Sequence, residues 1–490
     1  MSMHLADQPQ ELEVKFHLSD AAQAALAKHP VLPGDYRTVH EITTYFDTPR
    51  RDLMRAGATL RVRRQGDRRV QTIKLRNGAG AFGRGEWEWP VKSDAPDPRR
   101  LVETPLASMV EAVFEPVFVT DVQRDVRVVQ HDNATIEVAI DRGQVRAGDA
   151  AEEIRELELE LKRGDAQSMY RLAAALHASA PMSLGAESKA DRGWRLRTGH
   201  PRQAVKHVNV ALPADVTMAN AFRDIMDGVL AHFMANGPAA ASGDIEGVHQ
   251  MRTAIRRARA ALLLFQSHIE PHAAAEFTNA LRSLGRIFGE ARDWDVFCTD
   301  MLDAAEQHGI ASSLLDLLRQ PAEAERVAAH ARVTAELDAP LLTATVLGLA
   351  QWEFASDTPL VDLAPDLLAR LDHKVRQRGH HIARLDDEEL HKLRKSLKKL
   401  RYSVEFLAPL LPENDVKAYL HRCKTLLKQL GALNDGVVAV ALAEQLGGER
   451  KPELAPAVAA LAEWSVSHRS ALRQRIEEDW GKLQDKQLPH

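Results

Sequence analysis

Glu11-Leu12-Glu13-Val14-Lys15 is the stretch that decides how the first half of this chain is understood. In a β-strand, successive side chains point to opposite faces, so the two glutamates and the lysine share one face. Two carboxylates and an ammonium side by side can hold a divalent cation and an anionic ligand together. Alternation of this kind is also common in antiparallel sheets that have one face in water. The segment therefore predicts a strand, and its charged face is either solvated or part of a site.

Later segments of the first 200 residues repeat this alternation. Separated by Gly and Pro, they predict an antiparallel sheet with strands near residues 12–18, 59–64, 69–76, 86–91, 135–141 and 156–162. Like charges on neighbouring strands cost roughly 0.2–1 kcal/mol per pair, and a cation between them reverses the sign. A closed sheet with its charged faces turned inward would bring the acidic and basic rows together. Such a lumen suits a metal–polyphosphate ligand.

The composition limits the class of protein. At 490 residues the chain is too long for one core, so two or three domains are expected. The two cysteines, Cys298 and Cys423, form neither a zinc-site spacing nor a disulfide framework, which suits a reducing cytoplasm. We expect no signal peptide in residues 1–10 and no membrane helix, because no run reaches roughly 18 apolar residues. A net charge of −5 gives no indication of nucleic-acid binding.

The second half of the chain has a different pattern. Long Ala/Leu/Arg-rich stretches with helical spacing replace the alternation after about residue 216. The predicted fold is therefore α+β in two domains: an antiparallel sheet with flanking helices, and an all-α domain with an internal duplication. We predict a sheet domain at 1–200, a linker at 201–215 and a helical domain at 216–490, its two copies lying at about 216–350 and 360–490.

A basic motif occurs twice in the helical half. Each copy has a histidine followed by basic residues at +3, +7, +8 and +10: His249, Arg252, Arg256, Arg257 and Arg259, then His391, Arg394, Lys398, Lys399 and Arg401. Each copy is followed by a Leu-Gly step, Leu284-Gly285 and Leu430-Gly431, and by acidic residues. The duplication is on the scale of a helical bundle.

Most of these basic residues fall on one helical stripe, because positions i, i+3, i+7 and i+10 lie on one face. One interpretation is a solvated basic face; the other is a groove for a polyanion, favoured by the identical spacing of the two copies. Histidines in such a groove would hydrogen-bond phosphate and gain charge below about pH 6.5. Aromatic residues are scarce between the basic ones, which argues against binding of single-stranded nucleic acid.

The first half resembles the CYTH family of triphosphate tunnel metalloenzymes. The resemblance covers about residues 9 to 200 and rests on motifs in family order: Glu11-x-Glu13-x-Lys15, Thr44-Tyr45-Phe46-Asp47-Thr48, Leu60-Arg61-Val62-Arg63, Thr72-Ile73-Lys74, Glu86 and Glu88, Arg124, Glu137, Asp141, Glu156–Lys162, Ser188-Lys189 and Arg192-Gly193.

The resemblance implies an eight-stranded antiparallel tunnel that binds a triphosphate together with a divalent metal. It implies Mg²⁺ or Mn²⁺ as cofactor, with Glu11, Glu13, Glu158 and Glu160 as metal ligands. The same four glutamates and Lys15 would be catalytic. The phosphate contacts implied by the resemblance are Lys15, Arg61, Arg63, Lys74, Arg124, Lys189 and Arg192.

The second half, from about residue 206 to 485, resembles the CHAD domain, a conserved-histidine α-helical domain often found after a CYTH domain. This resemblance implies two related four-helix units whose basic face binds inorganic polyphosphate, with the ten repeat residues named above as the binding set.

Together these features predict a metal-dependent inorganic triphosphatase that hydrolyses tripolyphosphate to pyrophosphate and phosphate. The expected partners are tripolyphosphate and polyphosphate, with no nucleic acid and no membrane; the expected location is the cytoplasm, free or at polyphosphate granules. The alternatives are a non-catalytic polyphosphate-binding adaptor, an adenylate cyclase of the CYTH type, and a thiamine or nucleoside triphosphatase.

Overall fold

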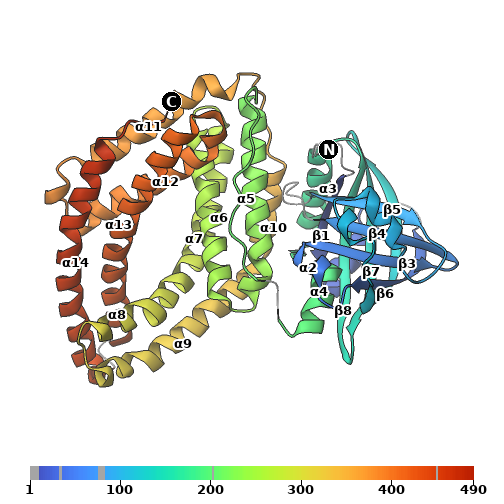
Figure 1. Ribbon diagram of the computed structural model, residues 1–490, viewed down its shortest axis with the longest axis horizontal. Coiled ribbons are helices and arrows are strands. Elements are labelled where there is room, and N and C mark those ends of the chain that lie inside the picture. The colour runs from blue at the N-terminus through green and yellow to red at the C-terminus, as the bar shows by residue number, and fades with distance from the viewer. Residues whose placement is uncertain (1–9, 33–35, 76–82, 201–202, 448–450, 490) are drawn as a thin grey trace. The chain divides into compact units, whose positions relative to one another are not determined.

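The computed structural model describes residues 10–32, 36–75, 83–200, 203–447 and 451–489 (Figure 1). The chain divides into two compact units, and the predicted two-domain α+β class is confirmed. One unit contains Met1–Val205, Met234–Ser242 and Leu337–Trp352, and the other contains the rest of the chain. Residues 1–9 of the predicted sheet domain and 201–202 of the predicted linker lie outside the described residues.

A curled antiparallel sheet forms the first unit. Its order is β5-β4-β3-β2-β6-β7-β8-β1-β9, and a further pairing of β1 with β5 brings the two ends of the sheet together. The predicted count of eight strands omits β9, a two-residue strand that pairs with β1. The strands are β1 Gln10–His17, β2 Arg37–Asp47, β3 Ala58–Gln65, β4 Arg68–Leu75, β5 Gly83–Pro90, β6 Glu115–His131, β7 Ala134–Ala147, β8 Ala150–Arg163 and β9 Ser183–Leu184.

The apolar face of the sheet packs outward, under helices. Val14 and Phe16 of β1 and Leu157 and Leu159 of β8 are fully buried, and α3 packs against both strands. Because side chains alternate along a strand, this burial turns the charged residues of β1 and β8 to the inner face. The helices of this part of the chain are α1 Asp20–Leu26, α2 Asp52–Arg55, α3 Ala166–Ser179 and α4 Lys189–Thr198.

Helix α4 is held tightly against the sheet. Ser188 caps it, and the reciprocal bond from Asp191 completes a capping box. A Cβ atom on Gly193 would lie 2.2 Å from the Phe118 ring, so only glycine permits this close approach to β6. The start of α4 is thereby fixed beside the inner face of the sheet.

The helical unit carries the duplicated motif on two helices that pack against each other, α6 and α12. The second copy contains α11–α14, and the first contains α5–α9 with a π-helical segment, η4 Phe297–Met301, before α8, so the two copies differ in their helices. The helices are α5 Met218–Ala241, α6 Ile245–Leu264, α7 Pro271–Val296, α8 Leu302–Gln307, α9 Ser312–Leu337, α10 Pro340–Ala350, α11 Leu360–Gly379, α12 Asp387–Leu407, α13 Glu413–Gly447 and α14 Ala455–Gln484. By contacts, α10 belongs with the sheet unit, where it packs on α3.

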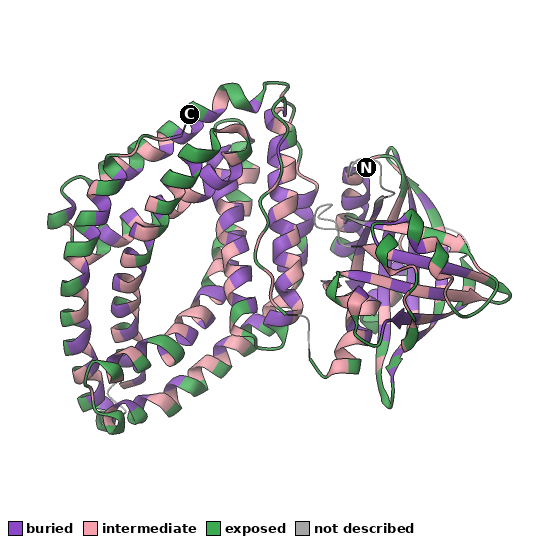
Figure 2. Ribbon diagram, in the orientation of Figure 1, coloured by how far each residue is buried: buried purple, intermediate pink, exposed green. Residues whose placement is uncertain are grey.

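Helix α13 is the one helix among the described residues that is by itself long and apolar enough to cross a membrane. It packs against α12 and α14, and residues such as Tyr419, Cys423 and Leu426 are fully buried. Figure 2 shows purple residues along the helices of this unit. Burial inside the helical unit accounts for part of the apolar composition of α13, since 39% of its most apolar window is buried.

Candidate functional site

The inner face of the curled sheet encloses a cavity of about 230 Å³ with a strongly charged lining. The lining has as many acidic as basic side chains. The acidic ones are Glu11, Glu13, Glu41, Glu86, Glu88, Glu137, Asp141, Glu158 and Glu160, and the basic ones are Lys15, Arg37, Arg61, Arg63, Arg68, Lys74, Arg124, Lys162 and Lys189. The charged face of the opening motif therefore lines a cavity, and the solvated-face interpretation is wrong.

One group of carboxylates is arranged to hold a cation. Oxygen atoms of Glu11, Glu86 and Glu160, from three different strands, lie within 4.8 Å of one another. Burial raises the pKa of Glu160, and Glu11 and Glu137 add to this by repulsion, although Lys162 opposes it. A hard divalent ion with oxygen ligands fits this donor set, since it would offset both the burial and the repulsion.

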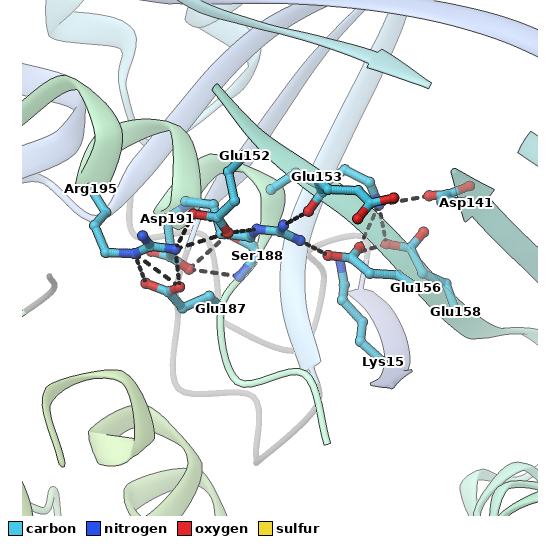
Figure 3. A network of polar contacts seen from close by, with 12 residues as sticks. Lys15, Asp141, Glu152, Glu153, Glu156, Glu158, Glu187, Ser188, Asp191 and Arg195 are labelled. Atoms are coloured by element: carbon cyan, nitrogen blue, oxygen red, sulfur yellow. Dashed lines mark hydrogen bonds and ion pairs between the residues drawn. The ribbon is translucent and has the colours of Figure 1, made fainter. Parts of the chain in front are cut away.

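A second acidic group already surrounds an internal cation. The ammonium of Lys189 lies 2.7 Å from Asp141, 2.9 Å from Glu156 and 2.8 Å from Glu158. Figure 3 shows Glu156 and Glu158 side by side with Lys15 next to them. Burial alone would lower the pKa of Lys189, but the three carboxylates more than offset it and raise the pKa. At this second group, the lysine therefore takes the place that a metal would need.

Several further lumen cations are paired with carboxylates. Lys74 donates to both oxygens of Glu11 at 2.6 Å, and Lys15 lies 2.8 Å from Glu158. Burial raises the pKa of Glu158, but Lys15, Lys189 and Arg124 hold it well below its usual range. Arg124 also forms two hydrogen bonds to Asp141. A triphosphate entering this lumen would exchange these pairs for contacts with its own oxygens.

The structure places three of the four predicted metal ligands in these two groups. Glu11 and Glu160 lie in the three-carboxylate group, together with Glu86, for which the resemblance left open a role as a ligand or as a group behind the ligands. Glu158 belongs to the group around Lys189, and Glu13 lies 3.3 Å from Lys15.

Six of the seven predicted phosphate contacts line the cavity, and Arg192 does not. Arg192 is buried, donates to Glu152 at 2.7 Å and to Glu156 at 2.6 Å, and bonds to the backbone carbonyl of Glu153. This network, part of which is drawn in Figure 3, ties α4 to β8. Arg192 is thus placed to position Glu156 instead of binding phosphate directly.

Strand β2 supplies lining residues that the sequence patterns missed. Arg37, Glu41 and Tyr45 all face the cavity, and the side chain of Gln65 donates to Glu41. The alternation along 37–47 was the available signal, but only the end of this strand stood out as a motif. Asp47 in that motif is structural: its carboxylate accepts the backbone N–H groups of residues 48, 53 and 54.

In the helical unit, the two basic stripes converge on one another. Arg256 is repelled by Arg252 and Arg394, so burial and like charge lower its pKa to about 10. Burial and repulsion from Arg256, Arg394, Arg252 and Arg401 lower the pKa of Lys398 to about 5. The two stripes therefore form one cationic cluster between α6 and α12, whose charge carboxylates only partly offset; after the groove that the sequence predicts, this cluster is named the α6–α12 groove.

The two halves of the α6–α12 groove are built alike. Arg252 packs 3.7 Å from the ideal Cβ position of Gly289 and donates to Asp293 at 2.9 Å. Its counterpart Arg394 packs 3.8 Å from the corresponding position of Gly431. The sequence equated Gly431 with Gly285, but Gly285 faces Ile255 instead. Gly289 is the true counterpart, since it leaves room for an arginine at the same place.

The motif histidines are poorly placed to carry charge in the free protein. Burial and the nearby Arg292 lower the pKa of His249 to about 4. Burial also lowers the pKa of His391, although its ring Nδ1 donates a hydrogen bond to the side-chain oxygen of Asn434. Without a bound anion, desolvation and neighbouring cations disfavour the imidazolium form of both rings.

The +8 and +10 residues differ from one another in their partners. Arg257 is 3% exposed, and its guanidinium forms a 2.7 Å ion pair with Glu405, so it is a core residue and not a groove residue. Arg401 lies 3.8 Å from the same glutamate. Lys399 has its pKa lowered by burial and then by Arg259, so these two form a separate basic group.

Comparisons with known proteins agree with both halves of the chain. Residues 9–194 match the family model of the CYTH domain, and residues 224–444 match that of the CHAD domain. An inorganic triphosphatase of Haemophilus influenzae is 29% identical over 196 residues, which cover 38% of this chain and 55% of that protein. The matched region thus spans about half the length of that relative.

Two solved structures show partial likeness. The CHAD domain from the plant Ricinus communis is 26% identical and covers 59% of this chain and 99% of its own, with a TM-score of 0.49. HpAC1 from Hippeastrum, described as having a dominant triphosphatase activity, is 16% identical and covers 39% of this chain and 95% of its own, with a TM-score of 0.28.

Proposed function

We propose that this chain, which consists of a CYTH domain followed by a CHAD domain, is a metal-dependent inorganic triphosphatase with a polyphosphate-binding helical domain. The observation that supports it most is the Glu11–Glu86–Glu160 group in a cavity that also holds the predicted phosphate-binding lysines and arginines. The proposed substrate is inorganic tripolyphosphate, which is cleaved by water to pyrophosphate and phosphate.

Charge balance in the lumen supports a metal–phosphate substrate over a free anion. The lining carries equal numbers of acidic and basic groups, so a bare triphosphate would add uncompensated negative charge in a poorly solvated space. Mg²⁺ or Mn²⁺, when held by Glu11, Glu86 and Glu160, supplies that compensation and polarises the phosphate oxygens. Lys74, which now bonds to Glu11, would then be free to turn to the phosphate.

The side chains of this chain would contribute to catalysis by holding the triphosphate in position for attack by water. Phosphoryl transfer needs charge neutralisation and an in-line arrangement of water more than it needs a covalent nucleophile. Arg61, Arg124 and Lys189 would hold phosphate oxygens from three directions, while α4 fixes the place of Lys189. Attack of water on the terminal phosphorus breaks the bridging P–O bond and releases phosphate, leaving pyrophosphate.

Phosphate release from tripolyphosphate with Mg²⁺ or Mn²⁺, with separation of the products, tests this proposal. The variant Glu11→Gln removes one ligand of the carboxylate group; Glu115→Gln is the matched control, because Glu115 is exposed and does not line the cavity. We expect turnover in the wild type and in Glu115→Gln only. Tight polyphosphate binding without turnover would favour the adaptor alternative, and preference for ATP or thiamine triphosphate would favour the others.

A further inference from the structure

Two arginines on the lining of the tunnel cavity have no partner among the described residues. Arg37 begins β2 and Arg68 begins β4, and both line the cavity while remaining exposed. The structure gives neither guanidinium a hydrogen bond or an ion pair with any described residue. In this respect they differ from Lys74 and Lys189, which form ion pairs with carboxylates.

The strand register places both arginines at one mouth of the tunnel. Gln65, at the end of β3, is directly opposite Arg68 across the β3–β4 turn. Arg37 lies opposite Val126, two residues outward from Arg124. Because each strand rises about 3.3 Å per residue, Arg37 stands roughly 7 Å outside the level of Arg124 along the strands. Arg37 therefore lies outside the level of Arg124, and Arg68 lies two residues outside the level of Arg63 on the β3–β4 hairpin.

The lining offers no place for a nucleobase. Tyr45 is the one aromatic side chain that lines the cavity among the described residues, and it is 3% exposed. Its ring stacks on Phe118 with centroids 4.6 Å apart, and its hydroxyl hydrogen-bonds with Arg61. Its faces are thus not free for the base stacking that a nucleoside would use.

We propose that Arg37 and Arg68 bind the fourth and later phosphates of a linear inorganic polyphosphate whose terminal three phosphates occupy the tunnel. The inference rests on the proposed triphosphatase function and extends its substrate class to longer chains, which the enzyme would shorten from the end. Arginine suits this role because its planar fork matches phosphate oxygens and stays charged. A nucleoside at the same place would meet two guanidinium groups and no free aromatic ring.

The test compares hydrolysis of tripolyphosphate with that of tetrapolyphosphate and longer chains of defined length. Full-length wild type, Arg37→Ala, Arg68→Ala and the double variant are assayed, with Arg64→Ala as the matched control. Arg64 belongs to the same β3–β4 hairpin but does not line the cavity. We expect the double variant to lose about threefold to tenfold in kcat/KM for the longer chains, as exposed ion pairs do. Tripolyphosphate and all Arg64→Ala rates should stay unchanged.

The outcomes separate the inference from the proposed function. Equal losses for tripolyphosphate and longer chains, or no hydrolysis of longer chains, would overturn the inference and leave the triphosphatase standing. Hydrolysis of longer chains but not of tripolyphosphate would overturn the proposed substrate. It would leave standing the role of Arg37 and Arg68 in binding longer chains. Hydrolysis of no phosphate chain would overturn both. ATP hydrolysis impaired by the double variant would assign the mouth to nucleotides and refute the inference.

Discussion

Binding of polyphosphate to the α6–α12 groove should take up a proton at Lys398. In the free protein, burial and then the neighbouring arginines lower the pKa of this lysine to about 5. At pH 7 only about one molecule in a hundred then carries the charge. A polyanion in the groove offsets the repulsion from Arg256 and Arg394, so the pKa of Lys398 must rise on binding.

The sign and size of the effect follow from linkage. A group that is neutral in the free protein and charged in the complex binds close to one proton per binding event. The affinity should therefore fall about tenfold for each unit of pH increase, between the free pKa near 5 and the higher pKa of the complex. Arg256, with its pKa lowered to about 10, stays charged at neutral pH and adds little to this slope.

Isothermal titration calorimetry in two buffers with different ionisation enthalpies measures the proton number directly. The titrations use full-length protein and long-chain polyphosphate in EDTA, between pH 6 and 8. Polyphosphate has titrating end groups of its own, so Lys398→Gln serves as the reference in every buffer. Lys417→Gln is the matched control, because Lys417 is an exposed lysine on α13 that pairs with Glu413.

We expect wild type and Lys417→Gln to take up about one more proton than Lys398→Gln. If the proton number and the pH slope are the same in all three proteins, then Lys398 is already charged in the free groove, or polyphosphate binds elsewhere. Either result would refute the reasoning, and loss of binding in Arg252→Ala would distinguish the two, since that variant weakens only a complex formed in the groove.

Three further predictions concern single residues. Glu11→Gln should lower metal-dependent tripolyphosphate turnover at least about a hundredfold while leaving polyphosphate affinity unchanged, measured by phosphate release and calorimetry. Arg257→Ala should destabilise the protein by about 3 kcal/mol in urea unfolding, because it removes the 2.7 Å partner of the buried Glu405 and leaves only the more distant Arg401 at 3.8 Å; a change in polyphosphate affinity without loss of stability would contradict the core assignment. Gly193→Ala should lower the melting temperature and the tripolyphosphate activity together, since its Cβ would collide with Phe118; unchanged melting would show that α4 can shift outward.

The sequence predicted the sheet well where the alternation was strict. Residues 156–162 and 12–18 were placed on strands with the correct inward face, because in each segment apolar side chains alternate strictly with charged or polar ones, which leaves one orientation. Strand β6, Glu115–His131, was missed, although it is the longest strand. Its polar and apolar residues do not alternate cleanly, because part of its outer face is exposed, so the pattern lacked the contrast that burial produces.

The sequence could predict which side chains face the lumen, but not which of these side chains pair with one another. Alternation shows that Glu158 and Glu160 share a face, yet it cannot show that Lys189 from a distant helix neutralises Glu158 and leaves Glu160 to the other group. The place of Arg192 could not be predicted for a related reason. It is three residues from Lys189 on α4, but its side chain turns to Glu152 instead of the lumen. Contacts between segments far apart in sequence decide such roles.

The lumen of the sheet and the α6–α12 groove differ in what an anion needs in order to bind. This difference follows from how the cations of each site are paired. Lumen cations such as Lys74 and Lys15 have carboxylate partners at 2.6–2.8 Å, so a phosphate must bring a metal to take those carboxylates over. In the α6–α12 groove the cations outnumber the nearby acids, and the stored repulsion is visible in the lowered pKa of Lys398 and Arg256. An anion there needs no metal, since it removes a repulsion that the folded chain otherwise sustains. Under the proposed function, a chain with both sites would hold polyphosphate where metal is scarce and cleave phosphate only where metal is present.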